Sequence, residues 1–315
     1  MSPDRPRLAV AIATYRRPDG LEDLLLSLAA SEDAPPFDVV VVDNDPEGSA
    51  AVVLDALAPS LPFSLIRVHV AEPGIAAARN AALDAVRDHD HVCFVDDDET
   101  VDPTWLAELV ALQESTGADG VTGPVVFDFD VPPPRWSLLG GFWVRPRPGH
   151  GASCRVAATN NLLLSVAALH DRGLRFDASL GLTGGSDMEL TERLTSTGGT
   201  IVWCESAVVR ERVPAPRCRA RWIVRRAVRS GNTTALVQAS LSREAGPFRR
   251  AGVTAVLVAG GVVRVLLGAV LVVSAPAVDR QVRGARGLRV LLRGLGVLGA
   301  CLRRPVEEYA RPQQG

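Results

Sequence analysis

Lysine is absent from this 315-residue sequence, so all 34 basic side chains are arginines. Cysteine is scarce as well: the five cysteines, at positions 93, 154, 204, 218 and 301, form no CxxC pair and no close cluster. A zinc ribbon, a thioredoxin motif and a disulfide scaffold therefore do not fit, and a reducing compartment is expected. The opening segment MSPDRPRLAV has charges and no long apolar run, so we expect no secretory signal ahead of the first strand.

Charge is distributed unevenly along the chain. Residues 1–204 hold 14 arginines against 30 acidic residues, a balance of −16, whereas residues 205–315 hold 20 arginines against 6 acids, a balance of +14. The hydrophobic content of 47% argues against a disordered chain. The asymmetry predicts an acidic catalytic part and a basic part that faces an anionic partner.

Short apolar runs alternate with helical patterns over the first 130 residues. The runs are β-branched and bounded by turn residues, as in buried strands of a mostly parallel sheet, and they cover 8–14, 38–43, 65–70 and 91–96. Helical patterns lie between and after them, at 18–30, 47–57, 75–88 and 103–116, and Asp102 is expected to cap the last one. The alternation predicts a layered α/β domain in which helices flank the sheet.

Polar residues directly follow three of the predicted strands, at Thr14–Tyr15, Asp43–Asn44 and Asp96–Asp98. In open α/β sheets, ligand sites gather at the carboxyl ends of the strands. We therefore expect these three segments to meet in one site.

The chain becomes irregular after this first half. Residues 128–160 combine proline, glycine and aromatic residues, which predicts a long ordered loop over the site. Helical patterns return at 187–197 and 215–231, and a strand is expected near 201–206.

The C-terminal third is apolar and rich in arginine. Residues 253–278 are apolar except for Arg264 and are long enough to cross a bilayer, and residues 287–302 are amphipathic. One central arginine costs roughly 2.5–3.5 kcal/mol in a spanning helix, and flanking arginines suit an anionic cytoplasmic leaflet. We expect membrane contact, either across the bilayer or in its interface; the alternative is a buried helix packed on the α/β domain.

Four acidic residues follow one strand without interruption, from Asp96 to Glu99. Such a cluster repels itself unless a cation lies among the carboxylates. Mg²⁺ or Mn²⁺ takes few carboxylates and fills its remaining positions with phosphate oxygens, so a diphosphate ligand would complete the site. The alternative is a solvated acidic turn ahead of the next helix.

The chain resembles the family 2 glycosyltransferases with the GT-A fold in four ordered segments: RLAVAIATYRRPDGLEDLLLSL, DVVVVDND, GIAAARNAAL and HVCFVDDDE. A later segment, LTGGSDMELTERLTSTGGTIVWCESAVVRERVPAPRCRARWIVRRAVRSGN, is similar to the bacterial branch that includes succinoglycan-type exopolysaccharide glycosyltransferases. The match covers residues 7 to about 232, some 70% of the chain. It implies a GT-A catalytic domain over 1–232, with a nucleotide-binding half (7–127) and an acceptor-side half (128–232), and a membrane-associating helical tail over 233–315.

The resemblance implies roles for polar residues near the strand ends. Thr14 and Tyr15 would hold the nucleotide, and Asp43 would recognise its base. Arg79, in the ARN segment, would lie near the nucleotide, and its place early in a helix, against the macrodipole, favours a ligand role. Alternatively, Thr14 and Asp43 are simple strand-end caps and Arg79 pairs with one of several acids.

The resemblance also implies different roles for the acids of the triplet Asp96–Asp98. Asp98, its last member, would be the ligand of a divalent cation, manganese or magnesium. Asp96 and Asp97 would lie at the nucleotide, with Asp96 nearer the ribose.

On the acceptor side, the resemblance makes Asp187 the base that deprotonates the acceptor hydroxyl. The family motif GG-Glu-Asp reads GGSD at 184–187, so Ser186 replaces a glutamate and the positioning of the acceptor is affected. Alternatively, Ser186 and Asp187 cap the helix that follows. Asn160, in the pair Asn160–Asn161, resembles the polar position beside the sugar.

These features predict an inverting, metal-dependent hexosyltransferase that uses a nucleotide-diphosphate sugar and a lipid-linked or saccharide acceptor in exopolysaccharide or cell-wall glycan synthesis. Processive relatives carry Q/R-x-x-R-W; here Cys218 precedes Arg221-Trp222, which favours single additions. The arginine run 217–229 could grip donor phosphates, lipid pyrophosphate or anionic lipid. No nucleic acid is expected, because no recognition fold accompanies the run.

We expect the protein at the cytoplasmic face of the plasma membrane, peripheral or single-spanning. One alternative is a non-catalytic, transferase-like membrane assembly protein, which Ser186 would support. The other is a sugar nucleotidyltransferase, which needs a GxGxR-type loop that ATYRRPDG lacks.

Overall fold

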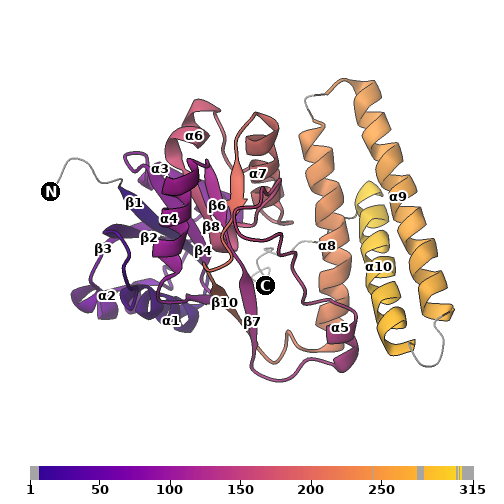
Figure 1. The fold of residues 1–315 in the computed structure, drawn as a ribbon, viewed down its shortest axis with the longest axis horizontal. Helices are drawn as coiled ribbons and strands as arrows, with labels where there is room; N and C mark the ends of the chain where they lie inside the picture. Colours follow the sequence, from indigo (N-terminus) through magenta and orange to yellow (C-terminus); the bar gives the residue numbers. More distant parts are fainter. Residues whose placement is uncertain (1–6, 244, 275–279, 303, 305, 307–315) are drawn as a thin grey trace.

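The computed structural model describes residues 7–243, 245–274, 280–302, 304 and 306. Its strands are β1 Leu8–Thr14, β2 Phe37–Asp43, β3 Ser64–His69, β4 His91–Asp96, β5 Glu99–Val101, β6 Gly120–Thr122, β7 Val125–Phe129, β8 Leu162–Ser165, β9 Ile201–Trp203 and β10 Val209–Val213. Its α-helices are α1 Pro18–Ala29, α2 Ala51–Leu57, α3 Ile75–Ala85, α4 Trp105–Thr116, α5 Arg135–Leu139, α6 Val166–Asp171, α7 Ser186–Ser196, α8 Ala220–Leu241, α9 Pro247–Val273 and α10 Arg280–Cys301 (Figure 1).

A seven-stranded sheet in the order β3-β2-β1-β4-β8-β6-β9 forms the centre of the fold. β1 runs parallel to β2 and β4, whereas β8 runs antiparallel to β4 and β6. The register places Thr14 beside Asp43 and Ala13 beside Asp96, so the polar strand ends meet at one edge as expected. A three-stranded sheet in the order β5-β10-β7 begins just after the acidic triplet.

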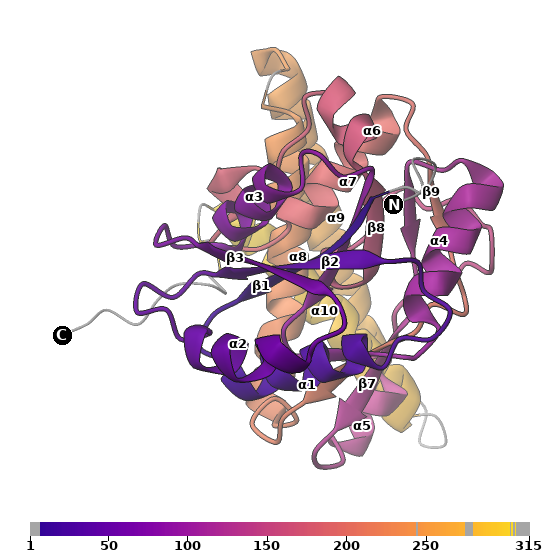
Figure 2. The ribbon, with the colours of Figure 1, turned by 90° about the vertical axis from the view of Figure 1, so that its left-hand side faces the viewer.

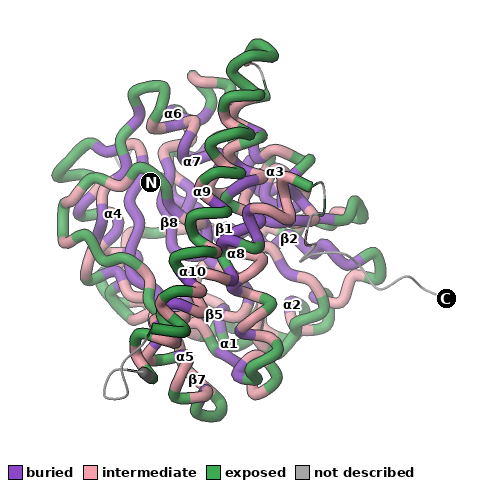
Figure 3. The backbone as a smooth tube through the Cα atoms, turned by 90° about the vertical axis from the view of Figure 1, so that its right-hand side faces the viewer, coloured by how far each residue is buried: buried purple, intermediate pink, exposed green. Residues whose placement is uncertain are grey.

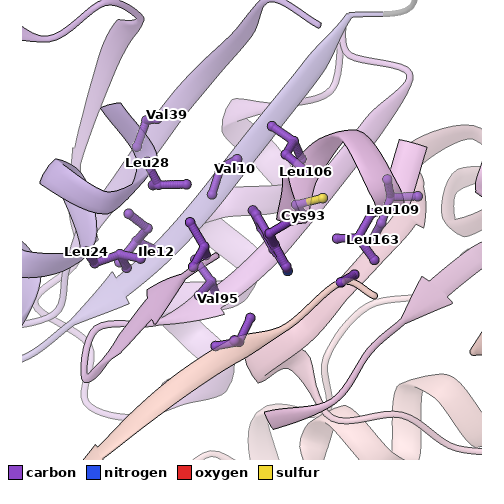
Figure 4. Packing of buried hydrophobic residues seen from close by; sticks show 14 of the residues in the cluster. Val10, Ile12, Leu24, Leu28, Val39, Cys93, Val95, Leu106, Leu109 and Leu163 are labelled. Atoms are coloured by element: carbon purple, nitrogen blue, oxygen red, sulfur yellow. The ribbon is translucent and has the colours of Figure 1, made fainter. Parts of the chain in front are cut away.

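Side-chain alternation in β1 explains why helices cover both faces of the large sheet (Figure 2). Val10 and Ile12 pack in one core with leucines of α1 and α4, whereas Ala9 and Ala11 pack in another with α3 and α7. Figure 4 shows part of the first core, and its labelled side chains come from α1, α4, β1, β2, β4 and β8: Leu24, Leu28, Leu106, Leu109, Val10, Ile12, Val39, Cys93, Val95 and Leu163.

The predicted α/β class and the four N-terminal strands are confirmed, each strand within one residue. The predicted helix at 47–57 begins only at Ala51, because the Asp43 carboxylate accepts the N–H groups of Asp45 and Ala50 and holds the intervening residues in a turn. The expected cap by Asp102 is wrong. Its carboxylate accepts a hydrogen bond from Arg210 (2.9 Å), and no side chain caps α4.

The expected irregular segment, 128–160, contains the end of β7 and the short helix α5 but is otherwise largely without regular structure. Its aromatic residues pack with β10 and the start of α8 in a cluster of their own, which contains Trp143, Val213, Cys218, Ile223 and neighbouring rings. The aromatic part of the segment is therefore anchored to β10 and α8, while its end packs on the main core through Ala157 and bonds to β9.

Three long helices stack beside the sheet domain in the order α8, α10, α9 (Figure 1). α8 packs against α7, and it continues unbroken through residue 232, where the sequence placed the start of the tail. α9 is the one helix in the described ranges that is long and apolar enough to cross a membrane, with a mean hydropathy of 2.6 and 11% of that stretch buried. Its outer side is exposed along most of its length (Figure 3).

Candidate active site

A cavity of about 460 Å³ lies at the carboxyl ends of β1 and β4, and residues of α8 form part of its wall. Six of the nine residues proposed from sequence line it: Thr14, Tyr15, Asp96, Asp97, Asp98 and Asn160. Further lining residues come from segments far apart in the chain and include Arg17, Asn44, Gly74, Arg145, Glu211, Arg217, Trp222, Arg226 and Arg229.

Asp97 fastens the end of β1 to the acidic turn. One carboxylate oxygen accepts hydrogen bonds from the Thr14 hydroxyl (2.9 Å) and the Tyr15 N–H (3.4 Å), and the other accepts one from Arg17 (2.7 Å). Burial raises the pKa of Asp97, and the charge of Arg17 opposes that rise. The Thr14 side chain therefore takes part in this hydrogen-bond network, and Asp97 mainly holds the end of β1 and Arg17 in position at the cavity.

Asp98 lies between two arginines. Its Oδ2 is 3.0 Å from a guanidinium nitrogen of Arg17 and 2.8 Å from one of Arg217. Arg17 is local, whereas Arg217 comes from the segment before α8, 119 residues away. The predicted metal ligand therefore links the segment after β1 to the segment before α8.

Asp96 carries the most perturbed carboxyl group in the cavity wall. Burial raises its pKa to about 6; Arg79 opposes the rise, while Asp98, Asp97 and Asp187 add to it. The Arg79 guanidinium is 3.3 Å from Asp96 Oδ1. Arg79 itself is buried and does not line the cavity, so it acts on the site through Asp96.

Glu99 is buried behind the acidic triplet, and its carboxylate links the Asp96 backbone to the Asn160 side chain. One oxygen accepts the Asp96 N–H (2.9 Å) and the other accepts the Asn160 amide (3.0 Å). Asn160 is thereby held at the cavity wall. Asn161 has a different role: its side chain bonds to Trp105 and to the carbonyls of 124 and 207, inside the core.

We expect Glu99→Leu to leave the Asp96 N–H and the Asn160 amide without their acceptor. Each buried unsatisfied group costs about 1–3 kcal/mol, so the free energy of unfolding should fall by at least that amount. Glu99→Gln keeps one acceptor for the Asp96 N–H and can donate to Asn160 after its amide turns over. Chemical denaturation of the two variants should show a clear loss for Leu and a loss under about 1 kcal/mol for Gln; equal losses would mean that the two bonds do not matter.

Arginine and aromatic side chains form the opposite wall. Arg226 lies over the rings of Phe127, Trp143 and Trp222, at 5.1–5.3 Å from their centroids. Trp143 and Trp222 stack at 6.0 Å, and Arg145 pairs with Glu211 at 2.8 Å. This wall comes from α8, the irregular segment and β10, and it places positive charge opposite the acidic triplet.

The predicted base-recognition residue, Asp43, is buried at the strand end and does not line the cavity. Both of its oxygens accept backbone N–H groups, from Asp45 (2.9 Å) and Ala50 (2.7 Å), as in the strand-end cap considered from sequence. Its neighbour Asn44 lines the cavity instead, and its amide nitrogen donates to the carbonyls of Val70 and Glu72.

Asp187 lies in the first turn of α7, close enough to Asp96 to raise the pKa of that carboxyl. The residue before the helix is Gly185, and no side chain caps α7, so the alternative in which Ser186 and Asp187 cap this helix is wrong. Asp187 Oδ1 accepts the adjacent Met188 N–H (2.8 Å). A Cβ at Gly185 would lie 2.6 Å from Thr233 of α8, so this turn packs directly on α8.

No group of three His, Cys, Asp or Glu side chains gathers like a metal-ligand set in the described part of the chain. A cation that takes one or two carboxylates and completes its shell with phosphate oxygens needs no such group. Asp96 and Asp98 supply hard oxygen ligands on the cavity surface. Burial raises the pKa of Asp96, and the charges of Asp98 and Asp97 add to the rise, a repulsion that a cation would offset. The residues present therefore fit a diphosphate-bound divalent cation.

Sequence reasoning included Asn44 in a strand-end segment expected at the site, but it did not single out Arg17, Arg145 or Glu211. Arg17 lies two residues after Tyr15, so its place beside the end of a strand was a usable signal. Arg145 and Glu211 reach the cavity through tertiary packing of the irregular segment on β10, and nothing local in the sequence marks them.

Solved glycosyltransferases share this fold. The mannosyltransferase PcManGT from Pyrobaculum calidifontis, in complex with GDP-Man and Mn²⁺, matches with a TM-score of 0.62 at 19% identity, covering 93% of this chain and 87% of that one. S. aureus TarS 1–349, in complex with UDP-GlcNAc, matches with a TM-score of 0.55 at 15% identity and 90% coverage of both chains. The architecture is the GT-A glycosyltransferase fold.

Sequence comparison then gives the family. Residues 9–164 match the model of glycosyl transferase family 2. The succinoglycan biosynthesis protein ExoM of Rhizobium meliloti (strain 1021) is 38% identical over 226 residues, which are 71% of this chain and 72% of that protein. The chain belongs to glycosyltransferase family 2, as its strand-end motifs predicted.

Proposed function

We propose that this chain is an inverting, divalent-cation-dependent glycosyltransferase that transfers one hexosyl unit from a nucleotide-diphosphate sugar to an acceptor hydroxyl. The observation that carries this proposal is the cavity in which the ends of β1 and β4 face the arginine and aromatic wall of α8. Three carboxylates on one side and four arginines on the other suit a ligand with both phosphates and sugar hydroxyls.

The acidic wall suits the donor's diphosphate end. Asp98, with Asp96, would hold the cation, which when bound supplies charge stabilisation to the leaving diphosphate. Arg217 and Arg226 line the same cavity and are placed to stabilise negative charge that develops on the leaving group. Asn44 and Tyr15 lie on the β1–β2 side, where the nucleoside would bind.

Asp187 would act as the general base. It would take the proton from the acceptor hydroxyl while the oxygen attacks the anomeric carbon; the bond from that carbon to the diphosphate breaks, and the anomeric configuration inverts. Its position beside Asp96, at the start of a helix anchored on α8, supports this role.

The acceptor we propose is a lipid-linked saccharide in exopolysaccharide or cell-wall glycan assembly, reached at the cytoplasmic face of the plasma membrane. Two observations support this: the similarity to a succinoglycan biosynthesis protein and the exposed apolar helix α9. Cys218 is buried and bonded to the Val213 carbonyl, so it does not supply the polar group with which processive relatives begin their motif.

A thermal-shift screen of sugar nucleotides with manganese would test the donor proposal. A ligand at about 100 times its Kd stabilises by ~2.7 kcal/mol, which corresponds to a rise in Tm of roughly 5–10 °C. We expect one donor class to give this shift with manganese and a smaller shift with EDTA. Release of nucleoside diphosphate during incubation with bacterial membranes would confirm transfer. Binding without any release would favour the non-catalytic assembly role, and formation of sugar nucleotide from sugar phosphate would favour a nucleotidyltransferase.

A further inference from the structure

The outer face of α9 is an exposed apolar surface with no element of the described chain packed against it. Val256, Val263 and Val270, spaced seven residues apart on one stripe, are 71, 60 and 59% exposed. Leu266 and Leu267 extend the surface, and Phe248 at its N-terminal end is 92% exposed (Figure 3). An apolar face of this length marks an interaction surface.

The inner face of α9 is fixed to α10 by close backbone packing. A Cβ at Gly268 would lie 2.6 Å from the Leu291 N, and one at Gly294 would lie 2.9 Å from the Gly261 carbonyl oxygen. The opposite side of α10 packs on α8 just as closely, since a Cβ at Gly296 would overlap the Val228 carbonyl. α10 is therefore held between α8 and α9, and α8 is held by the catalytic domain (Figure 1).

Arginines gather along this helical stack. Partial burial and the neighbouring charges of Arg289 and Arg264 lower the pKa of Arg293, which shows that the three guanidinium groups lie close together. None of the three forms a salt bridge to an acid among the residues that the structure describes. Arg249 and Arg250 add exposed charge at the start of α9. An apolar face bordered by arginines complements an anionic lipid surface rather than another neutral protein face.

A spanning α9 conflicts with this packing. Since α10 contacts α9 along its length, α10 would have to enter the bilayer too, together with Arg283, Arg286, Arg289 and Arg293. Each arginine at the centre of a spanning helix costs roughly 2.5–3.5 kcal/mol. The alternative, separation of α9 from α10, would expose the glycine-lined faces of both helices.

We propose that α9 lies in the plane of an anionic membrane surface, with Val256, Val263 and Val270 toward the acyl chains, and does not cross the bilayer. An in-plane helix is buried about 5–10 Å into the boundary between headgroups and acyl chains. Packed helices lie about 8–10 Å apart, so the arginines of α10 fall at the depth of the lipid phosphates. This inference rests on the membrane association in the proposed function and specifies its geometry.

Cysteine labelling tests the geometry on full-length protein in bacterial membranes. Phe248→Cys and Ser274→Cys place exposed thiols at the two ends of α9, in a background where Cys154 and Cys301 are serine. A membrane-impermeant maleimide should label both thiols in inverted vesicles and neither in intact spheroplasts. Labelling of the two ends from opposite sides would overturn the proposal, as would labelling of neither end in either preparation.

Vesicle binding tests the partner. We expect purified protein to float with vesicles that contain about one third phosphatidylglycerol and not with phosphatidylcholine alone. Arg264→Gln with Arg293→Gln should weaken binding roughly 25-fold, since each arginine near an anionic surface contributes about fivefold (~1 kcal/mol). The triple variant Val256→Gln, Val263→Gln, Val270→Gln should abolish it. A matched triple variant at exposed sites on the catalytic domain should keep vesicle binding; its substitutions are Leu26→Gln, Val52→Gln and Val131→Gln.

The triple variants also separate this inference from the proposed function. Because the α9 stripe is exposed, its variant should keep its Tm and its manganese-dependent donor binding while losing vesicle binding. If the wild-type protein binds no sugar-nucleotide donor, the proposed function is refuted but this inference is not. The inference would be overturned if the wild type formed a dimer without lipid and did not bind vesicles, while the α9 triple variant was monomeric. A second copy of the chain would then cover this face.

Discussion

Replacement of Asp98 by Asn is expected to lower transfer about 10³-fold and to remove the manganese dependence of nucleotide binding. The carboxylate lines the cavity and is shared by Arg17 and Arg217, and in the proposed function it holds the cation that binds the donor. A metal ion supplies several kcal/mol of charge stabilisation to a leaving phosphate, and each 1.36 kcal/mol is tenfold in rate. The amide keeps the size and one oxygen but loses the charge.

Calorimetric titration of nucleotide with and without manganese measures this effect directly. The fold should persist, because loss of the two arginine contacts is offset by weaker repulsion on Asp96 and Asp97, whose pKa values Asp98 helps to raise. Asp102→Asn is the matched control: it too pairs with an arginine, Arg210, but it lies outside the cavity and should leave binding unchanged. Manganese-dependent binding that survives in Asp98→Asn would contradict the assignment of this ligand.

The first four strands could be predicted closely because their signals are local. Each is a short apolar run, and β1, β2 and β4 end in polar residues at the carboxyl edge of the sheet. Register then brings Thr14, Asp43 and Asp96 side by side without further information. The GT-A fold and the positions of Asp96, Asp97 and Asp98 follow from this pattern.

The rest depends on contacts that leave no local trace. β5 and β6 have three residues each, too few for a periodic pattern, and are defined by their partners in the sheets. Asn160 and Asn161 are adjacent in sequence, yet only the tertiary structure assigns one to the cavity and the other to the core. The sequence also does not say which arginines of the run 217–229 reach the cavity. The helical periodicity of α8 places Arg226 and Arg229 at the cavity and leaves Arg221 and Arg225 exposed.

Replacement of Asp187 by Asn is expected to lower turnover by roughly 10²–10⁴, the usual contribution of a general base, while donor affinity changes little. Asp187 lies outside the residues that line the cavity, and its side chain accepts the next backbone N–H, which the Asn oxygen can also accept. The fold and the helix start should therefore be preserved. Single-turnover rates with a saturating acceptor, together with the Kd of the donor, would separate the two effects.

Glu189→Gln is the matched control for the base, because Glu189 is the other carboxylate in the first turn of α7. Glu189 is buried and lies 3.6 Å from Arg193, whereas Asp187 is only partly buried, so a proton from the acceptor has a shorter route to Asp187. We expect turnover within a few-fold of the wild type. If instead Glu189→Gln loses activity and Asp187→Asn keeps it, the base is Glu189, and the acceptor must approach from the inner side of α7 rather than across the cavity that Asp96 and Asp98 face.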